Sequence, residues 1–166
     1  MLQSGVIWQS TVICFGILLI WAAYSDARSF TIPNKLPIAI TLLYPAYVIG
    51  TPFPVDWLGA LAIATILLVI GFCLFACRAF GGGDAKLLAA SSLWVGPSLL
   101  LDFVFVTALA GGVIAGGMWI QHRLYRAASL GHLLVISDEE DFGKRPMPYG
   151  VALALGGLYV AFTILG

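Results

Sequence analysis

The sequence predicts an all-α membrane protein with six transmembrane helices and both termini outside. The first observation behind this prediction is composition: of 166 residues, 61% are hydrophobic and only 10% are charged. Soluble domains carry roughly 25% charged residues, so these charges are too few to cover a surface that faces water. The second observation is that the basic residues gather in three segments between apolar stretches. We therefore expect residues 1–166 to form a single membrane-embedded domain.

The apolar stretches divide the chain into six candidate spans. A transmembrane helix needs roughly 20 apolar residues. Residues 85–120 are too many for one helix, and the Gly-Pro-Ser sequence at residues 96–98 is a breaker near their middle. The second candidate is short and contains Pro37 and Pro45. The predicted spans are Gly5–Tyr24, Leu36–Gly50, Trp57–Cys77, Ala85–Val95, Leu99–Ile120 and Tyr149–Leu165.

The basic residues predict the orientation of these spans. They lie after the first span, around the connection between the third and fourth, and after the fifth: Arg28, Lys35, Arg78, Lys86, Arg123, Arg126, Lys144 and Arg145. The other two connections and both termini contain no Lys or Arg. Short loops rich in Lys and Arg face the cytoplasm. The three basic loops are therefore expected to face the cytoplasm.

Several other functions and sites are not expected. The net charge of zero and the absence of a basic stripe argue against nucleic-acid binding. Cys14, Cys73 and Cys77 lie in apolar stretches with no CxxC pair and no nearby His, so we expect small packing residues and neither metal nor cofactor. Gly112 and Gly116 form a small-xxx-small pattern, which favours packing within the chain over dimerisation. The oligomeric state stays open.

Two aspartates at the cytoplasmic ends of predicted spans indicate chemistry. Asp26 ends the first span and Asp84 begins the fourth. A structural role is open for each, because Asp84 suits a helix N-cap and Asp26 can pair with Arg28 at the surface. Two carboxyl groups close together in a poorly hydrated site cannot both ionise easily. One then takes a proton from water, and the protonated one polarises a scissile carbonyl. Gly81–Gly83 allows close approach of an extended peptide.

The remaining polar residues have supporting or alternative roles. Lys86 can tune the neighbouring carboxyl group or hold a lipid phosphate. Asp138–Asp141 is expected to be a solvated loop, with electrostatic attraction of a basic peptide as the alternative. His122 and His132 are assigned to the same polar loop. An alternative function is a small transport or assembly subunit that uses the two aspartates for ion handling, although relay acids normally lie within spans.

Three motifs in order resemble the type IV prepilin peptidase family of GxGD aspartic proteases. They are Asp26-Ala27-Arg28 with Ile32-Pro33-Asn34, then Gly81-Gly82-Gly83-Asp84, and finally Pro148-Tyr149-Gly150. The resemblance runs from about residue 15 to the C-terminus. It implies an endopeptidase that removes the short positive leader of prepilins or pseudopilins at the cytoplasmic face of the bacterial inner membrane. It also implies that the catalytic aspartates are Asp26 and Asp84, with Gly81, Gly82, Gly83 and Lys86 in supporting positions.

The chain departs from the larger members of that family. Those members carry a cytoplasmic insertion with a zinc-binding cysteine tetrad between the first two spans, and they also N-methylate the new terminus. Here about ten residues separate Asp26 from the second span, and the tetrad is missing. The chain is therefore similar to the short, peptidase-only branch that serves tight-adherence (Flp-type) pili, and N-methylation is not expected. The archaeal preflagellin and prepilin peptidases share GxGD and remain an alternative.

Overall fold

The fold consists entirely of α-helices in the residues that the structure describes. The structure is a computed structural model, and it describes residues 2–129 and 147–166. Their helices are α1 (Leu2–Ser29), α2 (Lys35–Gly50), α3 (Trp57–Ala76), α4 (Gly82–Val95), α5 (Leu100–Ser129) and α6 (Tyr149–Leu165). The predicted all-α class is confirmed. The acidic segment Asp138–Asp141 and His132 lie outside the described residues.

Two helices, α1 and α5, continue beyond the C-terminal ends of their predicted spans. Helix α1 continues to Ser29, which places Asp26 in its last turn. Helix α5 continues to Ser129, so His122 and Arg123 lie beyond the predicted span but in the same helix. Leu, Arg and Ala residues dominate this part of α5, and their high helix propensity explains the extension.

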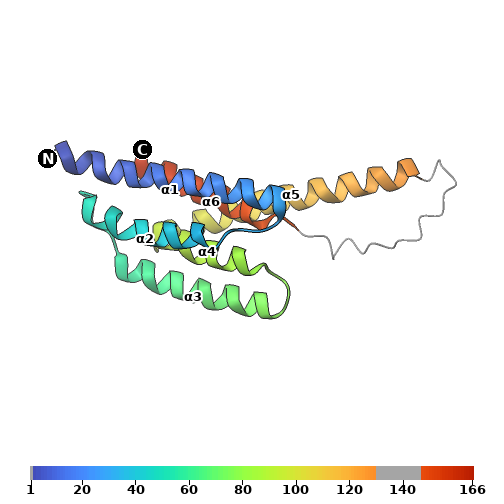
Figure 1. The fold of residues 1–166 in the computed structure, drawn as a ribbon, viewed down its shortest axis with the longest axis horizontal. Coiled ribbons are helices and arrows are strands. Elements are labelled where there is room, and N and C mark those ends of the chain that lie inside the picture. The colour runs from blue at the N-terminus through green and yellow to red at the C-terminus, as the bar shows by residue number, and fades with distance from the viewer. Residues whose placement is uncertain (1, 130–146) are drawn as a thin grey trace.

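Three helices contain segments that are long and apolar enough to cross a membrane. These segments are Ile7–Ser29, Trp57–Ala76 and Leu100–Leu124. Helices α2 and α6 are shorter apolar helices, and α4 has 14 residues. The two ends of the chain lie at the same end of the bundle, as six crossings would require (Figure 1). Membrane character is therefore supported, whereas six spans and outward termini stay predictions.

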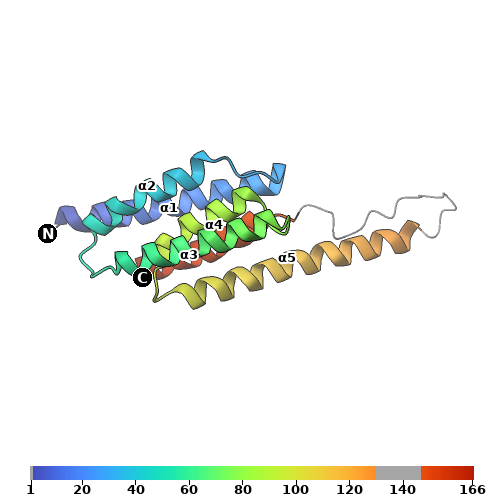
Figure 2. The ribbon, with the colours of Figure 1, turned by 90° about the horizontal axis from the view of Figure 1, so that it is seen from below.

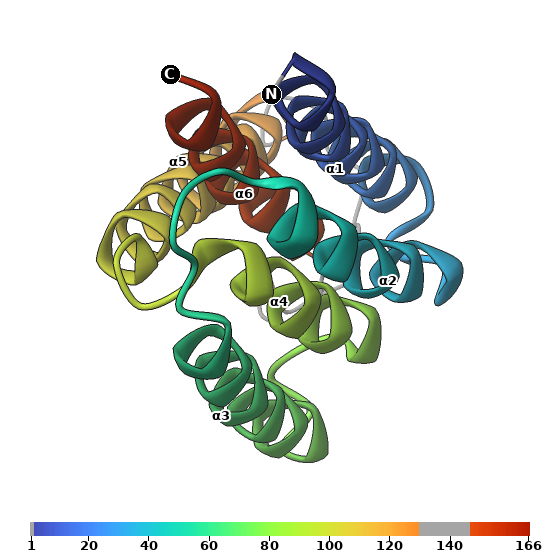
Figure 3. The same cartoon turned by 90° about the vertical axis from the view of Figure 1, so that its left-hand side faces the viewer.

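Helix α4 lies at the centre of the bundle (Figure 3). It packs against α2, α3 and α6, while α1 packs against α2 and α6, and α5 against α6. The connections α1–α2 and α3–α4 lie at the same end as the start of α6 (Figures 1 and 2). This end therefore brings together the last turn of α1 and the first turns of α4 and α6.

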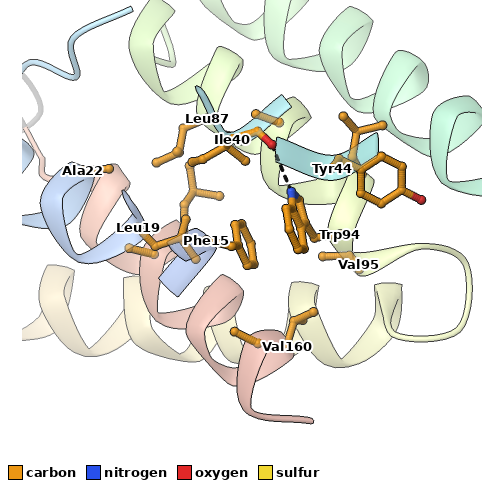
Figure 4. Close-up of a cluster of buried hydrophobic side chains, with 14 of the residues drawn as sticks. Phe15, Leu19, Ala22, Ile40, Tyr44, Leu87, Trp94, Val95 and Val160 are labelled. Atoms are coloured by element: carbon orange, nitrogen blue, oxygen red, sulfur yellow. Dashed lines mark hydrogen bonds between the residues drawn. The ribbon is translucent and has the colours of Figure 1, made fainter. Parts of the chain in front are cut away.

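Aromatic side chains join the three helices α1, α2 and α4 (Figure 4). The rings of Phe15 on α1 and Trp94 on α4 stack with centroids 4.4 Å apart. The indole N–H of Trp94 donates to the carbonyl of Ile40 on α2, at 3.2 Å. Lipid removes the hydrophobic drive for helix association, so packing contacts and interhelical hydrogen bonds of this kind stabilise the bundle.

The glycine pattern of α5 faces away from the rest of the described chain. A Cβ atom placed on Gly112 or Gly116 would meet no described atom within 4 Å. Gly111 instead lies toward α6, where its Cβ would be 3.7 Å from that of Ala152. The expectation that Gly112 and Gly116 pack within the chain was therefore wrong for the residues described.

The packing of Trp94 in the aromatic cluster leads to a prediction about the stability of the protein. Replacing Trp94, which is 3% exposed, by Ala removes the stack and the hydrogen bond to α2. We expect Trp94→Ala to lower the free energy of unfolding by about 3–5 kcal/mol. Trp21 is 60% exposed, so Trp21→Ala is the matched control and should cost less than about 1 kcal/mol. Denaturation in detergent micelles measures both, and equal losses would contradict the packing described.

Candidate active site

The two predicted aspartates are both buried at the same end of the bundle. Asp26 in the last turn of α1 is 3% exposed, and Asp84 in the first turn of α4 is 8% exposed. Carboxyl groups are almost never this buried unless a partner satisfies them. Their burial excludes the alternative that they are simple surface charges, and it raises the question of what each one contacts.

Asp26 is bonded to the start of α6. Its Oδ2 accepts a hydrogen bond from the backbone N–H of Gly150, with a donor–acceptor distance of 2.8 Å. The first N–H groups of a helix have no partner within the helix, and its positive end favours a carboxylate. Arg28 donates instead to the hydroxyl of Tyr24. The predicted surface pair of Asp26 with Arg28 was therefore wrong.

Gly150 has no room for a side chain. A Cβ atom there would lie 2.9 Å from Oδ2 of Asp26 and 2.7 Å from Cδ1 of Ile32. Sequence reasoning quoted the Pro-Tyr-Gly motif but assigned Gly150 no role. A Gly immediately after the start of a helix, where its helix propensity is poor, was the signal for such a close approach.

Asp84 reaches back to the start of its own helix. The N-cap of α4 is Gly81, and the N–H of Gly81 donates to the carboxyl group of Asp84. This is the reach that an acidic residue in a capping box makes. A Cβ atom on Gly81 would lie 2.6 Å from Oδ2 of Asp84, so glycine is needed at this position too. Asp84 is therefore not the N-cap itself, but it does satisfy a backbone N–H at the helix start.

The two carboxyl groups act on one another. Burial, followed by the charge of neighbouring Asp26, raises the pKa of Asp84 to about 7. Asp84 precedes the predicted fourth span and lies in the first turn of α4. Ile32 lies in the connection between α1 and α2. Its Cβ would be 3.1 Å from a Cβ atom placed on Gly83, and its Cδ1 lies close to Gly150. The site thus joins α1, α4 and α6 around a carboxyl pair.

The other predicted supporting residues face different neighbours. A Cβ atom on Gly82 would lie 3.2 Å from the ring of Phe75, so Gly82 packs against the end of α3. Lys86 lies two positions after Asp84, on another face of α4. Its Nζ donates to Oδ1 of Asn34 at 2.9 Å, which ties α4 to the start of α2. The described residues contain no group of three or more His, Cys, Asp or Glu side chains that could hold a metal.

Comparisons with known proteins agree with the sequence motifs. The profile of the type IV leader peptidase family matches residues 13–116, a range that includes Asp26 and Asp84. One similar protein is the prepilin leader peptidase/N-methyltransferase of Dickeya chrysanthemi, which is 28% identical over 178 aligned positions. The alignment covers 99% of this chain and 56% of that protein, so the chain spans about half the length of this relative. No solved structure matches the chain significantly.

The close contacts around Gly150 lead to a prediction about the stability of the protein. We expect Gly150→Ala to lower the free energy of unfolding by about 1–3 kcal/mol, because the new methyl group must displace Ile32 or the Asp26 carboxyl group. Gly112→Ala is the matched control: its Cβ meets nothing within 4 Å, and Ala should stabilise α5 by about 0.5–1 kcal/mol. Unfolding in detergent micelles measures both variants. A stability gain in both would show that Gly150 is not crowded.

Proposed function

Because this chain belongs to the type IV leader peptidase family, we propose that it is a membrane-embedded aspartic endopeptidase. It removes the short leader of type IV (Flp-like) prepilins or pseudopilins at the cytoplasmic face of the bacterial inner membrane. The observation that carries this proposal is the buried carboxyl pair of Asp26 and Asp84, which interact at one end of the bundle. The family match also favours this function over the alternative of ion handling in a transport subunit.

The pair supports hydrolysis without a covalent enzyme intermediate. The N–H of Gly150 stabilises a negative charge on Asp26, which suits this carboxylate to remove a proton from water. The raised pKa of Asp84 suits its protonated carboxyl group to donate to the scissile carbonyl oxygen. The water oxygen adds to the carbonyl carbon and forms a tetrahedral diol. The proton on Asp26 then passes to the leaving nitrogen as the C–N bond breaks, while the ionised Asp84 takes a proton back from one hydroxyl of the diol. This leaves a carboxyl group on the leader and an amine on the pilin, and it returns both aspartates to their starting protonation states.

The charge distribution supports a cytoplasmic site. The end of the bundle that contains the carboxyl pair also contains Arg28, Lys35, Arg78 and Lys86 at or near helix ends. Loops rich in such residues stay in the cytoplasm. A substrate would therefore place its apolar helix in the bilayer and its leader in the cytoplasm, so that the scissile bond reaches the membrane edge where Asp26 and Asp84 lie.

We restrict the proposal to leader cleavage, without N-methylation. The similar protein from Dickeya chrysanthemi is named for both activities, and this chain spans about half its length. The connection between α1 and α2 consists of residues 30–34, and the whole chain has three cysteines, too few for a cysteine tetrad. These features support the peptidase-only branch that serves Flp-type pili.

Replacing either aspartate tests the proposal directly. We expect Asp26→Asn and Asp84→Asn each to lower the kcat/KM for prepilin cleavage by about a hundredfold to ten-thousandfold, because each removes one half of the proton transfer. Asp102→Asn is the control, since Asp102 is exposed in the first turn of α5. Cleavage of a purified prepilin in detergent, followed by mass spectrometry of the leader, measures all three. Normal cleavage by both site variants would refute the assignment.

The protonation of Asp84 predicts how the rate depends on pH. Because its pKa is raised to about 7, its carboxyl group is protonated below that pH and can donate; above it, the group is ionised and cannot. We expect kcat/KM to fall as the pH rises above about 7, by up to tenfold for each pH unit. A profile that stays flat from about pH 6 to about pH 9 would show that Asp84 is not the proton donor.

A further inference from the structure

A groove opens between α2 and α3 on the side of α4 that faces away from α6. Its volume is about 510 Å³, and nearly all of its lining is apolar. Thr41 of α2 and Thr65 of α3 contribute to its walls, and Ala89 and Ala90 of α4 form its floor. Helices α2 and α3 both pack on α4 but barely touch one another (Figure 3).

The small residues of the groove favour a helix as its occupant. Ala89 and Ala90 of α4, Ala64 and Thr65 of α3 and Thr41 of α2 are all among its lining residues. Small residues of these types are enriched where transmembrane helices approach closely, because they let two backbones come near each other. An acyl chain needs no such close approach of backbones.

The groove has one polar end, which lies at the same end of α4 as the carboxyl pair but on another face of that helix. Lys86 and Asn34 line the groove and are hydrogen-bonded to each other at its cytoplasmic mouth. Lys86 follows Asp84 by two positions. Leu93, at the other end of the lining on α4, lies about 10 Å deeper along the helix axis. The groove therefore has the length of about two helical turns and begins at the depth of the proposed site.

We infer that this groove binds the apolar helix of the leader-bearing substrate and so positions the scissile bond at Asp26 and Asp84. The inference rests on the proposed function and deepens it by naming where the substrate binds. The occupant is a transmembrane helix whose first two turns lie between α2 and α3, with the preceding peptide extended at the membrane edge.

The start of α4 gives this peptide a path from the groove to the carboxyl pair. Gly82 lies one turn before Lys86 on the same face of α4, and the helix begins there. The carboxyl group of Asp84 is turned back toward exposed Gly81 at this same end. A peptide that leaves the groove therefore passes around the helix start, beside exposed Gly81 and the ring of Phe75 that packs on Gly82. Its unpaired backbone groups need partners at this depth, and the side chains of Asn34 and Lys86 can provide them.

Disulfide cross-linking tests the position of the substrate helix. The background is a variant without Cys14, Cys73 and Cys77, which are all exposed, and with Asp84→Asn to keep the substrate uncut. Thr41→Cys and Thr65→Cys place a thiol in the groove, and Thr163→Cys places one on the exposed surface of α6. All three threonine hydroxyls bond to the carbonyl four positions earlier, so each substitution removes the same kind of hydrogen bond.

The cross-linking partner is a prepilin with one cysteine in the first two turns of its apolar helix. We expect oxidation in membranes to give cross-links from positions 41 and 65 and none from position 163. No cross-link from either groove position, or equal cross-links from all three positions, would overturn the inference. Cross-linking measures where the prepilin lies, and the cleavage assay of the unaltered enzyme measures whether it is cut. Cleavage without a cross-link from the groove would overturn this inference alone, whereas the absence of cleavage would overturn the proposed function.

Filling the groove gives a kinetic test in the otherwise unaltered enzyme. Thr65→Trp occupies the groove from an exposed position, and Thr163→Trp is the control on α6. We expect Thr65→Trp to raise KM about tenfold with little change in kcat, because it blocks binding and leaves the carboxyl pair intact. Thr163→Trp should leave both constants within about twofold. If the groove holds only lipid acyl chains, Thr65→Trp will also leave KM unchanged, and the inference fails.

Discussion

The hydrogen bond between the Asp26 carboxyl group and the N–H of Gly150 is the constraint on which the site depends. It joins the last turn of α1 to the first turn of α6, across 124 positions of sequence. A buried carboxyl group without such a partner would be strongly unfavourable. The bond forms only because position 150 has no side chain, since a Cβ atom would touch both the carboxyl group and Ile32. The position of Asp26, and hence its interaction with Asp84, follows from this contact.

The rest of the bundle fixes α4 relative to α1 and α6. The stack of Phe15 on Trp94 and the bond from Trp94 to Ile40 hold the C-terminal part of α4 against α1 and α2. At the other end of α4, the carboxyl group of Asp84 accepts a hydrogen bond from the N–H of Gly81. The negative charge of Asp26 also acts on this carboxyl group. The same helix thus has one face toward the carboxyl pair and another toward the apolar groove, which lets one element serve both chemistry and substrate binding.

The sequence was sufficient to predict the helices and to predict that Asp26 and Asp84 could meet. It did not predict which residues contact the two aspartates. Apolar length and breaker residues predicted all six described helices to within a few residues at most ends. The positions of Asp26 and Asp84 at helix ends predicted that they could meet. The roles of Gly150 and Ile32 were missed, because hydropathy does not say which helix packs on which. For the same reason Gly112 and Gly116 were assigned to packing within the chain, although they face away from it.

The central claim is that Asp26 and Asp84 form one buried pair that shares a proton. Infrared spectroscopy of the protein with isotopically labelled Asp carboxyl groups, at pH near neutral in membranes, tests it most directly. The account predicts one protonated, buried carboxyl band that changes in both Asp26→Asn and Asp84→Asn and is unaffected in Asp102→Asn. A spectrum in which both carboxyl groups are fully ionised, or in which one substitution leaves the other group's band unaltered, would contradict it.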